Sequence, residues 1–166
     1  MKTQSVRVLH VEDSSTMRDL IRNLLQDLGL QAPVTCDTAT AAVHLLADSR
    51  FDVILSDYDL GEGPDGQSFL EKVRKDRLVP RDTVFIMLTA ERSYARVAQV
   101  VELAPDDYLV KPFAARVLEL RLFAQLARVS ALRPVLAAFD ANDPARALGL
   151  ARTIAKTEGP HQREAL

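Results

Sequence analysis

Five short apolar segments, each followed by an amphipathic segment, constrain the fold of this chain more than any other feature. Unbroken apolar runs are typical of parallel strands buried on both faces. Apolar residues at spacings of three and four are typical of helices that cover such a sheet. The pattern therefore predicts an α/β fold with a doubly wound, five-stranded parallel sheet. The predicted strands are residues 6–11, 34–36, 53–55, 84–88 and 108–110, and the predicted helices are residues 16–28, 38–49, 67–77, 92–104 and 114–131.

Polar side chains stand at the carboxyl ends of four of these strands. Glu12 and Asp13 follow the first strand, Asp57 the third, Thr89 the fourth and Lys111 the fifth. In open parallel sheets, ligands bind in the crevice beyond the carboxyl ends of the strands. Each residue alone is more typical of a cap or a turn, but together they predict one polar pocket.

The chemistry of this residue set points to phosphoryl transfer. Three carboxylates in one pocket would repel one another and raise their own pKa values unless a cation neutralised them. Ligation by oxygen atoms alone is typical of Mg²⁺. A carboxylate beside Mg²⁺ and the ammonium group of Lys111 can act as a nucleophile toward phosphorus. With Thr89 to hold phosphoryl oxygens, the residues predict Mg²⁺-dependent capture of a phosphoryl group on Asp57.

These motifs resemble the receiver domain of two-component response regulators over roughly residues 5–128. The resemblance rests on an acidic pair after the first strand, an acid after the third, Thr-Ala after the fourth and Lys-Pro-Phe after the fifth. It implies the strand order 2-1-3-4-5 of a flavodoxin-like fold. We therefore expect a receiver domain over residues 5–132 and a helical extension over residues 133–166.

The resemblance also implies the metal ligands. Asp57 would be the phosphoacceptor and would bind Mg²⁺ together with Glu12 and Asp13, while Asp59 would contribute its backbone carbonyl. Two of the departures from the family pattern concern the acidic pair and the turn after Asp57. An Asp-Asp pair is commoner than Glu-Asp, so the longer Glu12 is expected to reach the metal through water. The turn over residues 58–66 is one residue longer than usual, which leaves its shape open.

The same resemblance implies residues for holding the phosphoryl group and for switching. Thr89, the backbone N–H of Ala90 and Lys111 would hold the group. Tyr108 would be an aromatic switch that turns inward when Thr89 is drawn toward the phosphate, although a half-buried strand aromatic is equally common at such a position. The bond before Pro112 would be cis, which is largely confined to proline.

The expected function is therefore that of a signalling phosphoacceptor rather than an enzyme, with slow self-dephosphorylation. A sensor histidine kinase, a phosphotransfer protein or a small acyl phosphate would donate to Asp57. The new charge would change a surface on the fourth helix, fifth strand and fifth helix, where a downstream protein would bind. No signal peptide or membrane-spanning stretch is predicted, so we expect a cytoplasmic protein without a membrane partner.

The residues after Pro134 predict two short helices, residues 135–139 and 145–155, joined by a turn at Asn142-Asp143-Pro144. Their spacing resembles part of a tetratricopeptide repeat, and less closely a helix-turn-helix. A protein-interaction element is favoured over a DNA reader, because the mildly basic, aromatic-poor tail is not typical of a nucleic-acid surface. A plain helical extension and a homodimerisation element both stay open.

Two other readings compete with the receiver interpretation. A haloacid-dehalogenase-type phosphatase also uses an Asp-x-Asp nucleophile motif, as at Asp57 and Asp59, but it would need that motif after the first strand and an acidic motif after the lysine. Residues 61–66 match a dinucleotide-binding G-x-G-x-x-G, but they follow the third strand and carry acids that would repel a pyrophosphate. Both alternatives are therefore disfavoured.

Overall fold

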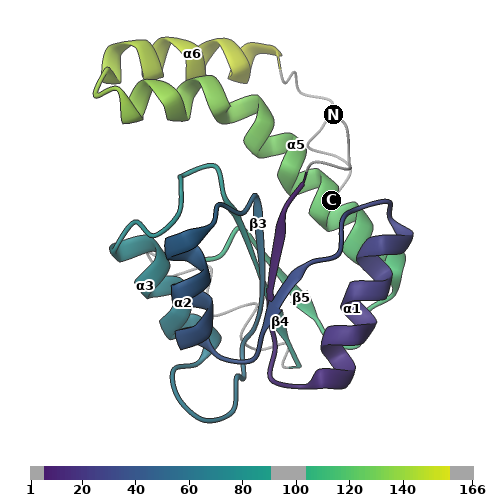
Figure 1. Cartoon of the computed structure of the whole chain (residues 1–166). Coiled ribbons are helices and arrows are strands. Elements are labelled where there is room, and N and C mark those ends of the chain that lie inside the picture. Colours follow the sequence, from purple (N-terminus) through teal and green to yellow (C-terminus); the bar gives the residue numbers. More distant parts are fainter. Residues whose placement is uncertain (1–5, 91–103, 158–166) are drawn as a thin grey trace. The chain divides into compact units, whose positions relative to one another are not determined.

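A computed structural model of the chain describes residues 6–90 and 104–157, and its five strands form one parallel sheet in the order β2-β1-β3-β4-β5 (Figure 1). The predicted fold class and strand order are confirmed. The strands are β1 (Val8–Val11), β2 (Val34–Cys36), β3 (Val53–Asp57), β4 (Val84–Thr89) and β5 (Asp107–Val110). In the register, Val11 of β1 lies beside Ser56 of β3, and Asp57 lies beside Leu88 of β4. Neighbouring strands therefore end at the same edge of the sheet. Glu12 follows β1 at this edge, and Asp57 is the last residue of β3.

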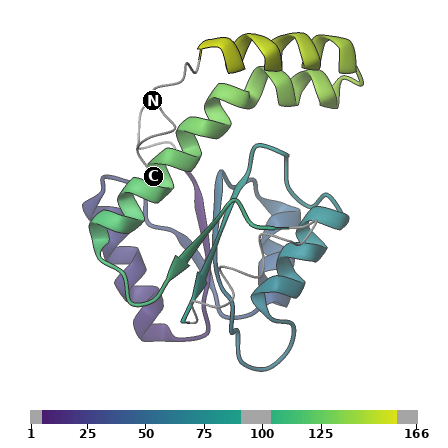
Figure 2. The same cartoon turned by 180° about the vertical axis from the view of Figure 1, so that it is seen from behind.

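Helices cover both faces of the sheet (Figures 1 and 2). α2 (Ala39–Asp48) and α3 (Gly66–Lys75) lie on one face, and α1 (Ser15–Asp27) and the first part of α5 (Ala115–Asp140) lie on the other. Successive strand residues point to opposite faces, so both layers receive apolar side chains. The helix predicted over residues 92–104 falls almost entirely outside the described residues.

The helix starts follow from capping residues that satisfy otherwise unpaired N–H groups. The side chains of Ser14, Thr38 and Asp65 accept hydrogen bonds from the third residue after each, at 3.4, 3.3 and 2.7 Å respectively. Gly29 follows the end of α1 with φ +75°, a conformation that favours glycine. Local sequence signals therefore set where these three helices lie relative to the strand ends.

Buried side chains of β1, β3, β4, α2 and α3 form the core on one face of the sheet. Phe69 of α3 and Phe85 of β4 pack in a tilted arrangement with 5.7 Å between ring centroids, and both are almost fully buried. His10 of β1 is fully buried, and neither ring nitrogen has a hydrogen-bond partner among the described residues. Cys36 of β2 is partly buried.

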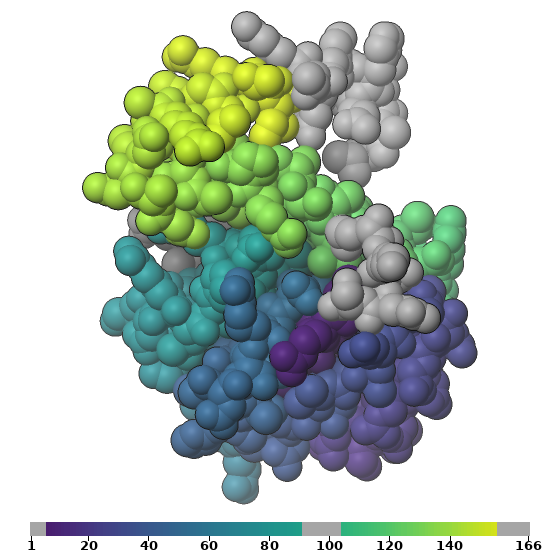
Figure 3. All heavy atoms as spheres, turned by 45° about the horizontal axis from the view of Figure 1, so that its top comes forward, coloured from purple at the N-terminus to yellow at the C-terminus, as the bar shows by residue number. Residues whose placement is uncertain are grey.

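The chain divides into two compact units, residues 1–125 and 126–166. In the second unit, α6 (Pro144–Thr157) packs against the end of α5 around Val135, Ala138 and Ala147 (Figure 3). Asp143 caps α6 by accepting the Arg146 N–H at 3.0 Å, as its sequence predicts. The two compact units divide after residue 125, whereas the sequence predicts a domain boundary after residue 132.

The expectation that a new element begins at Pro134 is wrong, because Pro134 lies inside the continuous helix α5. A proline removes one backbone donor from a helix, but the helix continues here. By length and composition alone, α5 reaches a mean hydropathy of 1.3 and meets the criterion for a membrane span, although no such stretch is predicted from the sequence. That evidence is weak, because length and composition alone carry it and Leu118 and Leu122 are fully buried in the protein.

Candidate functional site

The strand-end side chains meet in one cavity of about 630 Å³. β1, β3, β4 and β5 each deliver polar groups there because their carboxyl ends share one edge of the sheet. Of the eight residues with predicted roles, six line the cavity, whereas Glu12 and Tyr108 do not. The lining consists of Asp13, Asp57, Tyr58, Asp59, Gly61, Asp65, Thr89, Ala90 and Lys111.

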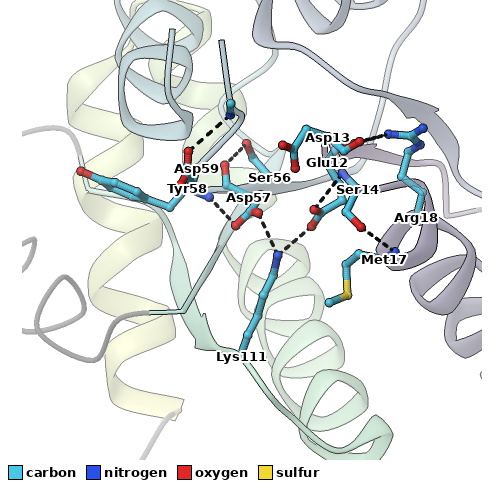
Figure 4. Close-up of polar contacts among 11 residues, drawn as sticks. Glu12, Asp13, Ser14, Met17, Arg18, Ser56, Asp57, Tyr58, Asp59 and Lys111 are labelled. Atoms are coloured by element: carbon cyan, nitrogen blue, oxygen red, sulfur yellow. Dashed lines mark hydrogen bonds and ion pairs between the residues drawn. The ribbon is translucent and has the colours of Figure 1, made fainter. Parts of the chain in front are cut away.

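Lys111 joins two of the carboxylates (Figure 4). Its Nζ lies 2.7 Å from Glu12 Oε2 and 2.9 Å from Asp57 Oδ2. Burial alone would lower the pKa of Lys111, but the hydrogen bonds to Glu12 and Asp57 outweigh it, so the pKa lies above its ordinary value of 10.5. The ammonium group is therefore charged at neutral pH and held against the proposed phosphoacceptor.

Glu12 is the most enclosed acid of the site, with 2% of its surface exposed. Burial raises its pKa above 4.5, while the ion pair with Lys111 pulls the pKa back down. Its second oxygen, Oε1, accepts the Ser14 N–H at 3.3 Å. Both oxygens are therefore engaged by groups of the protein, and the side chain stands behind Lys111 rather than on the cavity wall.

Asp13 is the exposed member of the acidic pair, and its backbone is fixed by α1. Arg18 Nη1 donates to the carbonyl oxygens of Glu12 at 2.6 Å and Asp13 at 2.9 Å (Figure 4). This clamp holds the loop between β1 and α1, so it sets the direction from which the two acids enter the site.

The turn that follows Asp57 is tied back to β3. The Tyr58 N–H donates to Asp57 Oδ1 at 2.8 Å, and the Gly66 N–H donates to the Tyr58 carbonyl at 2.8 Å. Gly61 and Gly63 have φ values of +68° and +107°, which only glycine adopts readily. The longer turn is thus a compact loop whose shape depends on its glycines, and it forms one wall of the cavity.

The residues present fit a magnesium ion. Glu12, Asp13 and Asp57 each offer an oxygen atom, and these three atoms lie within 4.8 Å of one another. Three hard oxygen donors with an exposed side at Asp13 suit an ion that keeps several water ligands. Both Glu12 oxygens also accept hydrogen bonds from the protein, one from the Ser14 N–H and one from Lys111 Nζ.

The residues expected to sense the phosphoryl group lie on β4 and β5. Thr89 is buried at the end of β4, and Ala90 follows it at the cavity wall. Tyr108 is partly buried and packs against the core, and its hydroxyl group has no hydrogen-bond partner among the described residues. Burial and the nearby Tyr58 raise its pKa above 10. The Lys111–Pro112 bond is cis, as the resemblance implies.

Sequence reasoning missed Arg18 and Gly66. Both residues shape the site, although neither lines the cavity. Arg18 lies in the first turn of α1, five residues after Asp13, so its position could have suggested a link to the strand end. Gly66 follows a capping aspartate, but nothing in the sequence indicates that a Cβ there would lie 2.1 Å from the Asp57 carbonyl oxygen.

Comparisons with known proteins agree with this geometry. Residues 8–123 match the family described as the response regulator receiver domain. A chemotaxis protein, CheY, of Pseudomonas aeruginosa is 34% identical over 125 residues, which cover 75% of this chain and 99% of that protein. Because that relative is matched along nearly its whole length, the rest of this chain has no counterpart in it.

Solved structures give the same result. The receiver domain of the Francisella response regulator 1452 has a TM-score of 0.65 and 26% identity, and covers 75% of this chain and 98% of that one. The chemotaxis response regulator CheY4 of Vibrio cholerae has a TM-score of 0.61 and 31% identity, with the same coverage. The matched family ends at residue 123, so it lends no support to the tetratricopeptide resemblance of the tail.

Proposed function

The chain belongs to the response regulator receiver family, and on this premise we propose that it is a phosphorylation-dependent signalling switch with Asp57 as phosphoacceptor. Proteins of this family are signalling phosphoacceptors that work with histidine kinases and downstream targets, and they bind Mg²⁺ at their acidic site. Membership disfavours the phosphatase alternative, whose nucleophile would follow the first strand.

The observation that carries the proposal is the position of Lys111 between Glu12 and Asp57. In the proposed reaction, an Asp57 carboxylate oxygen attacks the phosphorus of a phosphohistidine or an acyl phosphate. The bond from phosphorus to the donor's nitrogen or oxygen breaks, and the donor leaves with that electron pair. Bound Mg²⁺ would neutralise phosphoryl and carboxylate charge. The step modifies Asp57 covalently and leaves the other residues of the chain chemically unchanged.

The surrounding side chains have separate parts in this proposal. The Tyr58 N–H on Oδ1 and Lys111 on Oδ2 orient the Asp57 carboxylate. After transfer, Lys111 moves its free donors to the phosphoryl oxygens while Glu12 keeps it charged. Asp13, Asp57 and the Asp59 carbonyl would hold the metal, and Glu12 would reach it through water. Arg18 keeps the Asp13 backbone in place.

The output step follows from the new negative charge. We propose that Thr89 and the Ala90 N–H bind the phosphoryl oxygens and that Tyr108 packs inward behind Thr89. A protein partner then recognises the changed surface of β5 and α5; the fourth-helix part of that surface lies outside the described residues. A sensor histidine kinase or phosphotransfer protein would be the donor, in the cytoplasm, and phosphorylated Asp57 would hydrolyse slowly.

The helical pair at residues 126–157 is proposed to be a protein-interaction element attached to the receiver. It buries few side chains of its own, and its helices expose Phe139 and Leu148, each at 53%. A DNA-reading role is the alternative for this output. Gel-shift titration against non-specific duplex DNA would separate the two, since a salt-dependent shift would favour DNA.

Intact-mass spectrometry tests the phosphoacceptor. After incubation with acetyl phosphate and Mg²⁺, the protein should gain one phosphoryl group, and Asp57→Asn should gain none. Absence of the adduct on the unmodified chain, or an equal adduct on the variant, would refute the proposal. A chain lacking residues 126–166 should still be labelled if phosphorylation belongs to the receiver alone.

A further inference from the structure

A second cavity, of about 230 Å³, lies between α2 and α3. Its apolar wall is formed by Ala39, Val43, Pro64 and Phe69, and its charged or titratable groups are His44 and Lys72. Two hydroxyl side chains complete the lining, and no described residue lining it carries a carboxylate. None of the residues assigned to phosphoryl chemistry belongs to this cavity.

The size of the cavity suits one side chain better than a free ligand. Pockets for free small molecules usually measure roughly 300–1,000 Å³, and this one measures about 230 Å³. Interfaces between proteins, by contrast, commonly place a single large apolar anchor in such a pocket. The apolar wall therefore favours an anchor residue that a partner protein supplies.

The charge at the cavity favours an acidic partner. Lys72 pairs with Asp76 at 2.8 Å, and their side chains are 53% and 41% exposed. Exposed pairs of this kind contribute little stability, so the ammonium group can accept a second carboxylate at little cost. His44 lines the same cavity and is exposed.

We propose that this cavity is a docking site for one large apolar side chain carried on an acidic segment of a partner protein. The apolar side chain lies against Val43 and Phe69, and a neighbouring carboxylate of the partner meets Lys72.

Docking here is coupled to the acidic pocket because the same turn lines both cavities. Pro64 faces the apolar cavity, while Asp59, Gly61 and Asp65 line the acidic one. A side chain packed on Pro64 holds the turn in the conformation that lines the acidic pocket, so docking should favour Mg²⁺ binding by that conformation. This coupling rests on the proposed function, whereas the docking itself does not.

Two matched peptides test the docking, acetyl-Phe-Glu-amide and acetyl-Phe-Lys-amide, titrated into the metal-free, unphosphorylated full chain. Amide NMR shifts of Val43 and Phe69 should change and saturate at millimolar peptide. The Glu peptide should bind about twofold to fivefold more tightly than the Lys peptide, the range for an exposed ion pair. Lys72→Glu should reverse that order, and this exposed substitution should leave the fold intact.

Val43→Phe fills the cavity from inside and should abolish the shifts, while Val34→Phe, the same change at an exposed site on β2, should leave them unaltered. The docking proposal is wrong if no saturable shift appears, if Lys72→Glu leaves the order unchanged, or if Val43→Phe binds as tightly as the original chain. The Lys72→Glu comparison decides the question even if Val43→Phe fails to fold.

The coupling has its own readout. The Kd for Mg²⁺, followed by the Asp13 and Asp59 amide shifts, should fall in the presence of saturating Glu peptide. The peptide Kd should fall by the same factor when Mg²⁺ is present, because coupling between two binding sites is reciprocal. An unchanged or raised Kd for Mg²⁺ would refute the coupling. Peptide binding without any phosphoryl adduct would instead refute the proposed function and leave the docking site standing.

Discussion

Replacing Gly66 with alanine should destabilise the receiver unit and disturb its acidic pocket, because α3 begins in direct contact with β3. A Cβ at residue 66 would lie 2.1 Å from the Asp57 carbonyl oxygen and 2.9 Å from Met87 Sδ. Ordinary contact begins at 3.4 Å, so the helix start must move by about 1.3 Å, the difference between 3.4 and 2.1 Å. That movement also stretches the hydrogen bond from the Gly66 N–H to the Tyr58 carbonyl.

The expected magnitude follows from two opposing effects. Overpacking of this kind typically costs about 1–3 kcal/mol, while alanine in place of glycine in a helix interior gains at most about 1 kcal/mol, and less at a first helical position. The cost of overpacking should exceed the gain in helix propensity, so we expect a net loss of about 1–2 kcal/mol in the free energy of unfolding. The affinity for Mg²⁺ should fall with it, since the displaced turn carries Asp59.

Urea unfolding followed by tyrosine fluorescence measures this loss, because all three tyrosines lie within residues 1–125. Gly149→Ala is the matched control, since a Cβ there meets nothing within 4 Å and α6 should only gain helix propensity. The reasoning is refuted if Gly66→Ala unfolds at the same or a higher urea concentration than the original chain.

Three further predictions concern pH and capping. Burial, with Lys111 and two arginines nearby, lowers the pKa of His10 from 6.5 to about 3, so its contribution is complete above pH 6.5 and is lost as pH falls. At about 1.36 kcal/mol per pKa unit, the loss from pH 6.5 to pH 5 is about 2 kcal/mol, and urea curves of His10→Leu should lack it. Because the pKa of Lys111 is raised, its ion pairs contribute fully to the free energy of unfolding below pH 10.5, and this contribution is lost as pH rises further. Lys111→Met should remove that part of the loss of stability at alkaline pH. If the variant and the original chain lose stability identically at alkaline pH, the ion-pair account is contradicted. Asp65→Ala should cost about 1 kcal/mol in tyrosine-detected unfolding through loss of the α3 cap, whereas Asp143→Ala, which uncaps α6, should lower hydrogen-exchange protection only in the second unit.

The fold was predictable because its signals are local and repeated. Apolar runs identified the strands, and apolar residues at spacings of three and four identified the helices. The strand order required the resemblance to known proteins, since periodicity does not say which strands are neighbours. Pro134 led to a wrong prediction of a helix boundary. Proline is unfavourable inside a helix, but α5 continues past it to Asp140.

The residues that make up the site were predictable from the strand ends, but the hydrogen bonds and ion pairs between their side chains were not. The topology of a parallel sheet brings Asp13, Asp57 and Lys111 to one edge whatever the side-chain details. That Lys111 binds Glu12 and Asp57 together depends on side-chain reach and burial, which spacing along the chain does not encode. The closeness of Gly66 to β3 is likewise a property of packing between distant elements.

Chemical trapping of the phosphorylated residue tests the central claim most directly. Borohydride reduces an aspartyl phosphate to homoserine, so peptide mapping after incubation with acetyl phosphate, Mg²⁺ and borohydride locates the acceptor. We predict homoserine at position 57, only when both acetyl phosphate and Mg²⁺ were present. Homoserine at position 13 or 59, or equal labelling at position 57 without Mg²⁺, would contradict the account.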